Sequence, residues 1–149
     1  MIFEVIDNFT ADAAITIADR CNKANMILAT QVQKDTSPFV PFRTGSLDIR
    51  TQVVGDTIIY PGPYARYLYY GYKMVDSATG KGPMHYIDRH GDEVFRFRRG
   101  AVLTPTNEPL TYTTDFHKQA GPHWFERSKA QNLQKWLRVA EKVVNTGHE

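Results

Sequence analysis

Two groupings of histidine and acidic residues are the first candidates for chemistry in this sequence. The first places His85 and His90 five residues apart, with Asp88 and Asp92 close by. That spacing matches neither a helical two-histidine metal pair nor a zinc motif that includes cysteines. A solvated hairpin tip explains these polar residues better, because such tips are exposed and tolerant of polar side chains. We therefore expect no metal site here.

The second grouping is His123 and Glu126, three residues apart at the start of a predicted helix. One helical turn would bring the two side chains together, as a small hydrolase could require. Glutamate in a first turn is already explained by the helix dipole, however. The sequence has no G-x-S-x-G elbow, and Gly80–Pro83 lacks the spacing and following helix of a phosphate loop. We expect no enzyme and no cofactor, with a hydrolase kept as the weakest hypothesis.

Length and composition describe one ordinary domain over residues 1–149. Hydrophobic residues make up 42% and charged residues 23% of the chain, and the net charge is +2. No segment is basic enough to form a nucleic-acid platform alone.

The single cysteine, Cys21, falls on the apolar face of a predicted helix, which predicts a buried thiol and a reduced compartment. Residues 1–9 lack the pattern of a signal peptide, and no window has the length of a membrane span.

Two long helices are predicted, one near each end of the chain. The first runs from Thr10 or Asp12 to about Lys34, because this stretch has no glycine or proline and its apolar residues recur every three or four positions. The second follows Ala120-Gly121-Pro122 and ends before Gly147. Its expected apolar face consists of Phe125, Ser128, Leu133, Trp136, Leu137, Ala140 and Val144, with Trp124 beside them. We expect the second helix to pack beside the first, with both on one face of a sheet.

Strand patterns lie before and between these helices. Ile2–Ile6 alternates weakly and predicts one strand. Arg43–Ser46 predicts a turn, and the alternation of Leu47, Ile49, Thr51 and Val53 with polar residues predicts a half-buried strand. Gly55-Asp56 separates two β-rich runs and predicts a two-residue hairpin turn.

Four of the eight tyrosines fall within residues 61–71, which we call the tyrosine segment. Glycine and proline bracket a short helical turn there. We expect Tyr64 and Tyr67 to anchor the core, and Tyr69 and Tyr70 to be candidates for contact with another protein. The conservative interpretation places all of these rings in a core with their hydroxyls at its rim.

Residues 72–115, which we call the arm, carry short strand-like runs separated by polar turns. The expected strands are Met84–Asp88, Glu93–Arg98, Ala101–Leu103 and Leu110–Thr114, and Thr104–Pro109 is expected to be a turn. Alternation places Phe95 and Phe97 on one side and Arg96 and Arg98 on the other, with Arg99 just beyond. The arginines either guard an exposed edge or face a phosphate or protein partner.

Three blocks of sequence, in order, resemble the minor capsid proteins of tailed bacteriophages, within the broader head-tail connector, or neck and tail-completion, proteins. The blocks are Val40–Leu47, with its P-x-x-T-G-x-L turn, Pro63–Gly71, with its Y-A-x-x-x-x-x-G pattern, and Ala120–Lys129. The resemblance implies an α+β fold with a long N-terminal helix, a small antiparallel sheet with a hairpin arm, and a long C-terminal helix packed on the sheet.

The same resemblance implies a non-enzymatic virion protein at the head-tail junction, present in the host cytoplasm before assembly. It would form an oligomeric ring between portal-side or adaptor-side proteins and tail-side proteins, with passive contact with DNA in the channel and none with a membrane. Expected contact residues are Tyr69, Tyr70, Phe95, Arg96, Phe97, Arg98 and Arg99. Expected structural residues of turns and hinge are Thr44, Gly45, Tyr64, Ala65, Tyr67, Gly71 and Trp124. The alternative is a nucleic-acid-binding module that uses the basic arm and the C-terminal helix.

Overall fold

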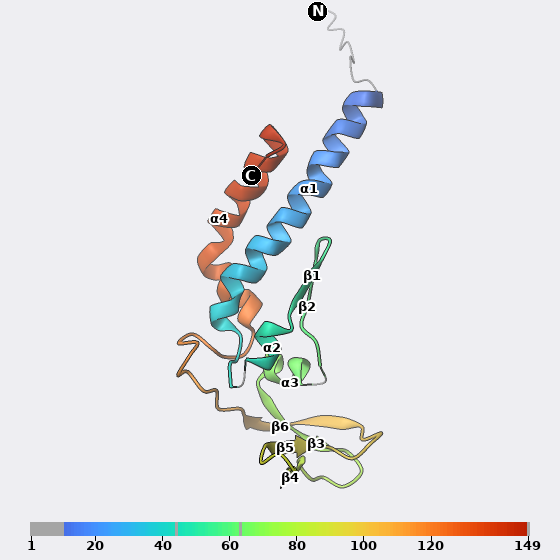
Figure 1. Ribbon diagram of the computed structural model, residues 1–149, viewed down its shortest axis with the longest axis vertical. Helices are drawn as coiled ribbons and strands as arrows, with labels where there is room; N and C mark the ends of the chain where they lie inside the picture. Colours follow the sequence, from blue (N-terminus) through green and yellow to red (C-terminus); the bar gives the residue numbers. More distant parts are fainter. Residues whose placement is uncertain (1–10, 44, 63, 149) are drawn as a thin grey trace, which may run out of the picture.

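The fold was analysed in a computed structural model that describes residues 11–43, 45–62 and 64–148. The predicted α+β class is confirmed: two long helices lie side by side, one short antiparallel hairpin lies alongside the first helix, and two further strand pairs lie beyond one end of the helices (Figure 1). The expected strand Ile2–Ile6 and the turn residue Thr44 lie outside the described residues.

Helix α1 spans Ala11–Thr36 and confirms the predicted first helix. It passes into a short 3-10 turn, Ser37–Phe39, that contains Pro38. The prediction that Cys21 is buried is wrong, because its side chain is exposed. The apolar face of α1 is covered only toward its C-terminal end, where Ala24, Ala29 and Val32 are buried.

Helix α4 spans Trp124–Thr146, ends at Gly147 and packs along α1. The Thr36 hydroxyl donates to Ser128 Oγ at 3.0 Å, and Lys23 Nζ donates to the Gly147 carbonyl at 2.7 Å. These two contacts fix an antiparallel pair. The prediction that α4 packs beside α1 is therefore confirmed, whereas the prediction that α4 packs on a sheet is wrong. The buried face of α4 therefore differs in part from the predicted apolar face. The buried residues are Trp124, Ser128, Trp136 and Val143, whereas Phe125, Leu133 and Leu137 are exposed.

The predicted strand at residues 47–51 is wrong, because this stretch forms the short helix α2, Ser46–Ile49. Gly45 precedes it with a φ of 75°, and the Ile49 amide donates to the Gly45 carbonyl at 2.8 Å. A Cβ at Gly45 would lie 2.7 Å from Phe42 Cζ, so glycine is required for both conformation and space. Only Leu47 and Ile49 of the alternating residues lie in this single helical turn, and two residues are too few for periodicity to distinguish a helix from a strand.

The hairpin prediction is confirmed. Strand β1, Gln52–Val54, pairs antiparallel with β2, Thr57–Ile59, around Gly55-Asp56. Helix α3, Ala65–Tyr70, then confirms the short helical turn of the tyrosine segment. It ends at Gly71, whose φ of 79° is the left-handed conformation that commonly closes helices.

The arm contains two separate antiparallel strand pairs. These are β3, Tyr72–Asp76, with β6, Leu103–Pro109, and β4, Met84–Ile87, with β5, Glu93–Arg96. The turn expected at residues 104–109 is therefore a strand, and the strand expected at Leu110–Thr114 is absent from this described stretch. Pro105 and Pro109 are tolerated because β6 has a neighbour on one side only within its described two-stranded ladder.

The core lies where α1, α4 and the tyrosine segment meet. Phe39, Val40 and Trp124 form its buried centre. Four partly buried side chains pack around it: Leu47, Tyr60, Leu68 and Tyr69. Tyr64, expected in this core, is 45% exposed, because it precedes α3 and donates its hydroxyl to the Phe95 carbonyl at 2.6 Å instead. Tyr67 is half-buried and Ala65 is buried.

Candidate interaction surface

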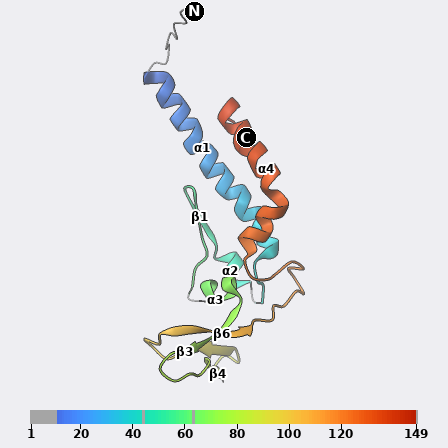
Figure 2. The ribbon, with the colours of Figure 1, turned by 180° about the vertical axis from the view of Figure 1, so that it is seen from behind.

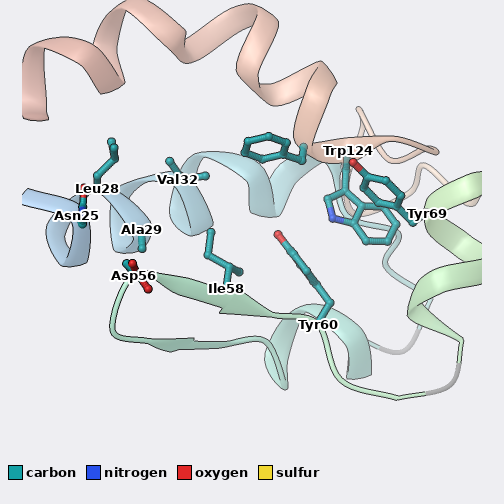
Figure 3. A pocket seen from close by; sticks show the side chains of 10 residues that line it. Asn25, Leu28, Ala29, Val32, Asp56, Ile58, Tyr60, Tyr69 and Trp124 are labelled. Carbon is teal, nitrogen blue, oxygen red and sulfur yellow. The ribbon is translucent and has the colours of Figure 1, made fainter.

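A groove of about 510 Å³ opens between α1, the β1–β2 hairpin and the start of α4 (Figure 3). Its lining is mostly apolar, with one carboxylate and one amide. The lining residues are Asn25, Leu28, Ala29, Val32, Asp56, Ile58, Tyr60, Tyr69, Trp124 and Phe125. A smaller hollow of about 230 Å³ shares Tyr60, Tyr69 and Trp124 with this groove. An apolar concavity with a few polar groups is the usual form of a binding site.

Trp124 forms the wall common to both hollows and is 1% exposed. Its ring meets Tyr69 edge-on at 4.7 Å and Tyr60 at 5.4 Å between ring centroids. The indole N–H makes no hydrogen bond of ordinary geometry among the described residues, although its contact with the Tyr60 oxygen opposes the rise in the pKa of Tyr60. Figure 3 shows this nitrogen and the Tyr60 hydroxyl directed toward the same part of the groove. A buried donor with a poorly placed acceptor is costly, so an incoming acceptor atom of better geometry would be favoured here.

Burial also affects the two tyrosines beside Trp124. It raises the pKa of Tyr60 to about 12, and the Asp48 carboxylate adds to the rise. Burial likewise raises the pKa of Tyr69, helped by the hydrogen bond that its hydroxyl donates to Glu126. Both phenols therefore remain protonated donors at neutral pH.

The histidine and glutamate of the hydrolase hypothesis lie at the rim of this surface. His123 adopts a φ of 49° before α4, and its amide donates to the Tyr69 carbonyl at 2.8 Å. Its ring lies edge-on to Tyr69 and Tyr70. Glu126 accepts the Tyr69 hydroxyl, and this bond lowers the pKa of Glu126. Both residues thus connect α4 to the tyrosine segment, which is a structural role.

The arm is the second unusual surface. No apolar side chain in this fully described segment is buried, and Asp76 is its only buried residue. Large apolar side chains are instead exposed: Tyr72, Met84, Tyr86, Ile87, Phe95 and Val102. The arm therefore has strands without a hydrophobic core of its own.

One side of the β4–β5 pair faces the body of the protein. His85 and Phe95 are cross-strand partners whose rings stack with centroids 4.5 Å apart. The Arg43 guanidinium lies 5.4 Å from the Phe95 ring centroid and forms an ion pair with Glu93 at 2.9 Å. Together with the Tyr64 hydrogen bond, these contacts fasten the arm to the body. Phe95, expected to contact a partner, here meets a residue of its own chain.

The arginines of the arm differ in their surroundings. Arg98 is bound to the buried carboxylate of Asp76, an acceptor that sequence spacing did not identify. Arg96 and Arg99 are exposed and have no ion-pair partner within the described ranges. Phe97 is half-buried and lies beyond the end of β5. Tyr70 is 53% exposed, whereas Tyr69 packs against the core.

The sequence patterns did not identify two residues of the groove, Tyr60 and Asp56, as candidates for binding. Tyr60 and Asp56 belong to the correctly predicted hairpin, but only the packing of that hairpin against α1 brings them to the groove.

In the part of the chain that the structure describes, no cluster of three or more metal-binding side chains occurs. No described helix is long and apolar enough to cross a membrane.

Comparison with known proteins identifies the class. Residues 6–86 match the profile of the family described as "Minor capsid protein". Because the match spans more than half of the 149 residues, the chain belongs to the minor capsid protein family. It is a structural protein of a phage virion. No curated protein and no solved structure gives a significant match.

Proposed function

We propose that this minor capsid protein acts without catalysis in the head-tail connector, or neck, of a tailed phage. It would form an oligomeric ring between the portal-side or adaptor-side proteins and the tail-side proteins. Before assembly it would be held in the host cytoplasm. The family membership supports a virion role, and the architecture of the arm supports a position between subunits.

The observation that carries the proposal is the arm without a core. Its exposed Met84 and Tyr86 gain little stability in an isolated subunit. Burial of apolar surface is the main favourable term in association, so these side chains are suited to a neighbouring subunit. The arm lies at one end of the molecule, and the N-terminal end of α1 and the C-terminal end of α4 lie at the other (Figure 2). A subunit of this form can contact different neighbours at its two ends.

Location in the virion tests the proposal. Purified phage particles would be labelled with gold-conjugated antibodies raised against the folded chain and viewed by electron microscopy. We expect label at the junction of head and tail only. Label distributed over the head shell would contradict the connector role while leaving the family membership intact. Particles from a phage with the gene deleted serve as the control for antibody specificity.

Contact with DNA is the second candidate function. Four basic residues of the arm are exposed without a described ion-pair partner: Lys81, Arg89, Arg96 and Arg99. In a ring, many copies of these residues could line the DNA passage and hold it by charge. Binding of the purified chain to duplex DNA should then weaken steeply as salt rises. No binding at low salt would dismiss this function.

A further inference from the structure

We propose that the groove beside Trp124 receives the outer face of the β4–β5 pair from a second copy of the chain. This inference rests on the proposed ring and names the interface that would build it. The groove and the arm would then form the two halves of one contact, repeated from subunit to subunit.

The outer face of the β4–β5 pair is defined by the strand register. Residues on alternate positions share a face, and Met84 pairs with Arg96 while Tyr86 pairs with Val94. The opposite face carries His85 and Phe95, which are held against Arg43 of the same chain. The outer face consists of Met84, Tyr86, Val94 and Arg96. It therefore points away from its own body and presents an apolar ridge with one cation.

The groove offers the matching chemistry. Leu28, Ile58 and Trp124 supply apolar walls. The indole N–H of Trp124, whose contact with the Tyr60 oxygen falls short of ordinary hydrogen-bond geometry, and the Tyr60 hydroxyl both face the groove. The phenol oxygen of Tyr86 can accept a hydrogen bond from one of these two donors.

Charge is complementary as well. Asp56 lines the groove at the hairpin turn and has no described ion-pair partner. Arg96 is the cation of the outer face and has no ion-pair partner among the described residues. Opposite charges across an interface fix its register and disfavour wrong pairings.

The positions of the two patches are compatible with a ring. The groove and the outer face are different patches of one chain, and the arm lies beyond the end of the body that carries the groove (Figures 1 and 2). A head-to-tail contact between such unlike patches propagates from copy to copy and closes into a ring when the rotation allows. A reciprocal dimer, with each copy's outer face in the groove of the other, would instead stop at two copies.

The experiment measures self-association of the full chain by light scattering and sedimentation over a concentration series. Tyr86→Ala removes the apolar anchor and should weaken association about 30-fold, as for a central interface aromatic. Ile87→Ala is the matched control, because Ile87 is an exposed apolar neighbour on the other face of the same strand. It should leave association unchanged.

A charge exchange tests the pairing directly. Arg96→Asp and Asp56→Arg should each weaken association about tenfold. The double variant, and an equal mixture of the two single variants, should both restore it, since each then pairs opposite charges. Both positions are exposed, and a circular dichroism melt verifies the fold of every variant.

The outcomes separate the two proposals. Wild-type association that survives Tyr86→Ala and both charge reversals would overturn the groove interface and leave the ring standing. Weakening in the single variants without restoration in the exchanged pair would also overturn the groove interface. A wild-type chain that stays monomeric at every concentration would overturn the groove interface and contradict self-assembly into a ring.

Discussion

The guanidinium of Arg98 donates two hydrogen bonds to the carboxylate of Asp76, which is 3% exposed at the base of the arm. Asp76 also accepts the Ala78 amide at 2.9 Å. The pair lies where β3 and β6 meet, since Asp76 is opposite Leu103 in the ladder. The arm is thus organised at its base by a charged pair and not by apolar packing.

Removing the cation should loosen the arm while leaving the helices intact. Arg98→Ala would leave the Asp76 carboxylate buried without its partner, and such groups are strongly unfavourable. We expect faster amide hydrogen exchange in Tyr72–Asp76 and Leu103–Pro109, with protection in α1 and α4 unchanged. Arg99→Ala is the control, because Arg99 is exposed without a described ion-pair partner. Equal exchange in the two variants would show that the pair does not order the arm.

Acid should have the same effect as the substitution. The hydrogen bond from Arg98, followed by the Ala78 amide, holds the pKa of Asp76 below its usual 3.8. A depressed folded-state pKa gives stability that is complete above about pH 4 and is lost as pH falls through the lower folded value. Order in the arm should therefore decrease as the pH falls below 3.8. In Asp76→Asn, exchange in the arm should already be fast at pH 7 and should change less with acid, and an equal acid response in both proteins would contradict this origin.

Trp124 should be the most sensitive position of the core. Trp124→Ala removes a buried aromatic and is expected to cost about 3 to 5 kcal/mol of unfolding free energy. Tyr64→Ala should cost about 1 kcal/mol, because that ring is exposed and loses mainly one hydrogen bond. Urea unfolding followed by circular dichroism measures both. A larger loss for Tyr64 than for Trp124 would reverse the assignment of the core.

Gly71 joins the tyrosine segment to the arm and should not tolerate alanine. A Cβ there would lie 2.8 Å from Pro122 Cβ, in addition to the strain of its left-handed conformation. Gly55 shares that conformation but has open space around it, so Gly55→Ala isolates the conformational cost of about 1 to 2 kcal/mol. Gly71→Ala should cost at least about 1 kcal/mol more than Gly55→Ala. Equal losses of unfolding free energy would mean that Pro122 moves away freely.

Local signals predicted much of this fold. The three- and four-residue spacing fixed the extent of α1, and Gly55-Asp56 located the hairpin. These elements depend on neighbours close in sequence, which a pattern records. The strand predicted at Leu47 to Thr51 is wrong because this stretch contains a single helical turn that follows Gly45. An alternating pattern cannot exclude a helix that short.

The interaction surface could be predicted only in part, because it depends on contacts between distant segments. The sequence pattern grouped Arg96 with Arg98 as candidate contact residues. The structure distinguishes them, because Arg98 binds the buried carboxylate of Asp76, 22 residues earlier in the chain. Tyr64 and Tyr69 exchanged their expected environments, since the first lies before α3 and the second faces Trp124. Spacing alone does not determine which face of a six-residue helix packs on a core.

The most direct measurement of the central claim is the mass of the full chain in solution, by light scattering after size exclusion, across a concentration series. A connector subunit that builds its own ring predicts a concentration-dependent rise from the 17.0 kDa monomer to a defined oligomer. The same oligomer should appear as rings by negative-stain electron microscopy. A mass of one subunit at every concentration would contradict a self-assembling ring.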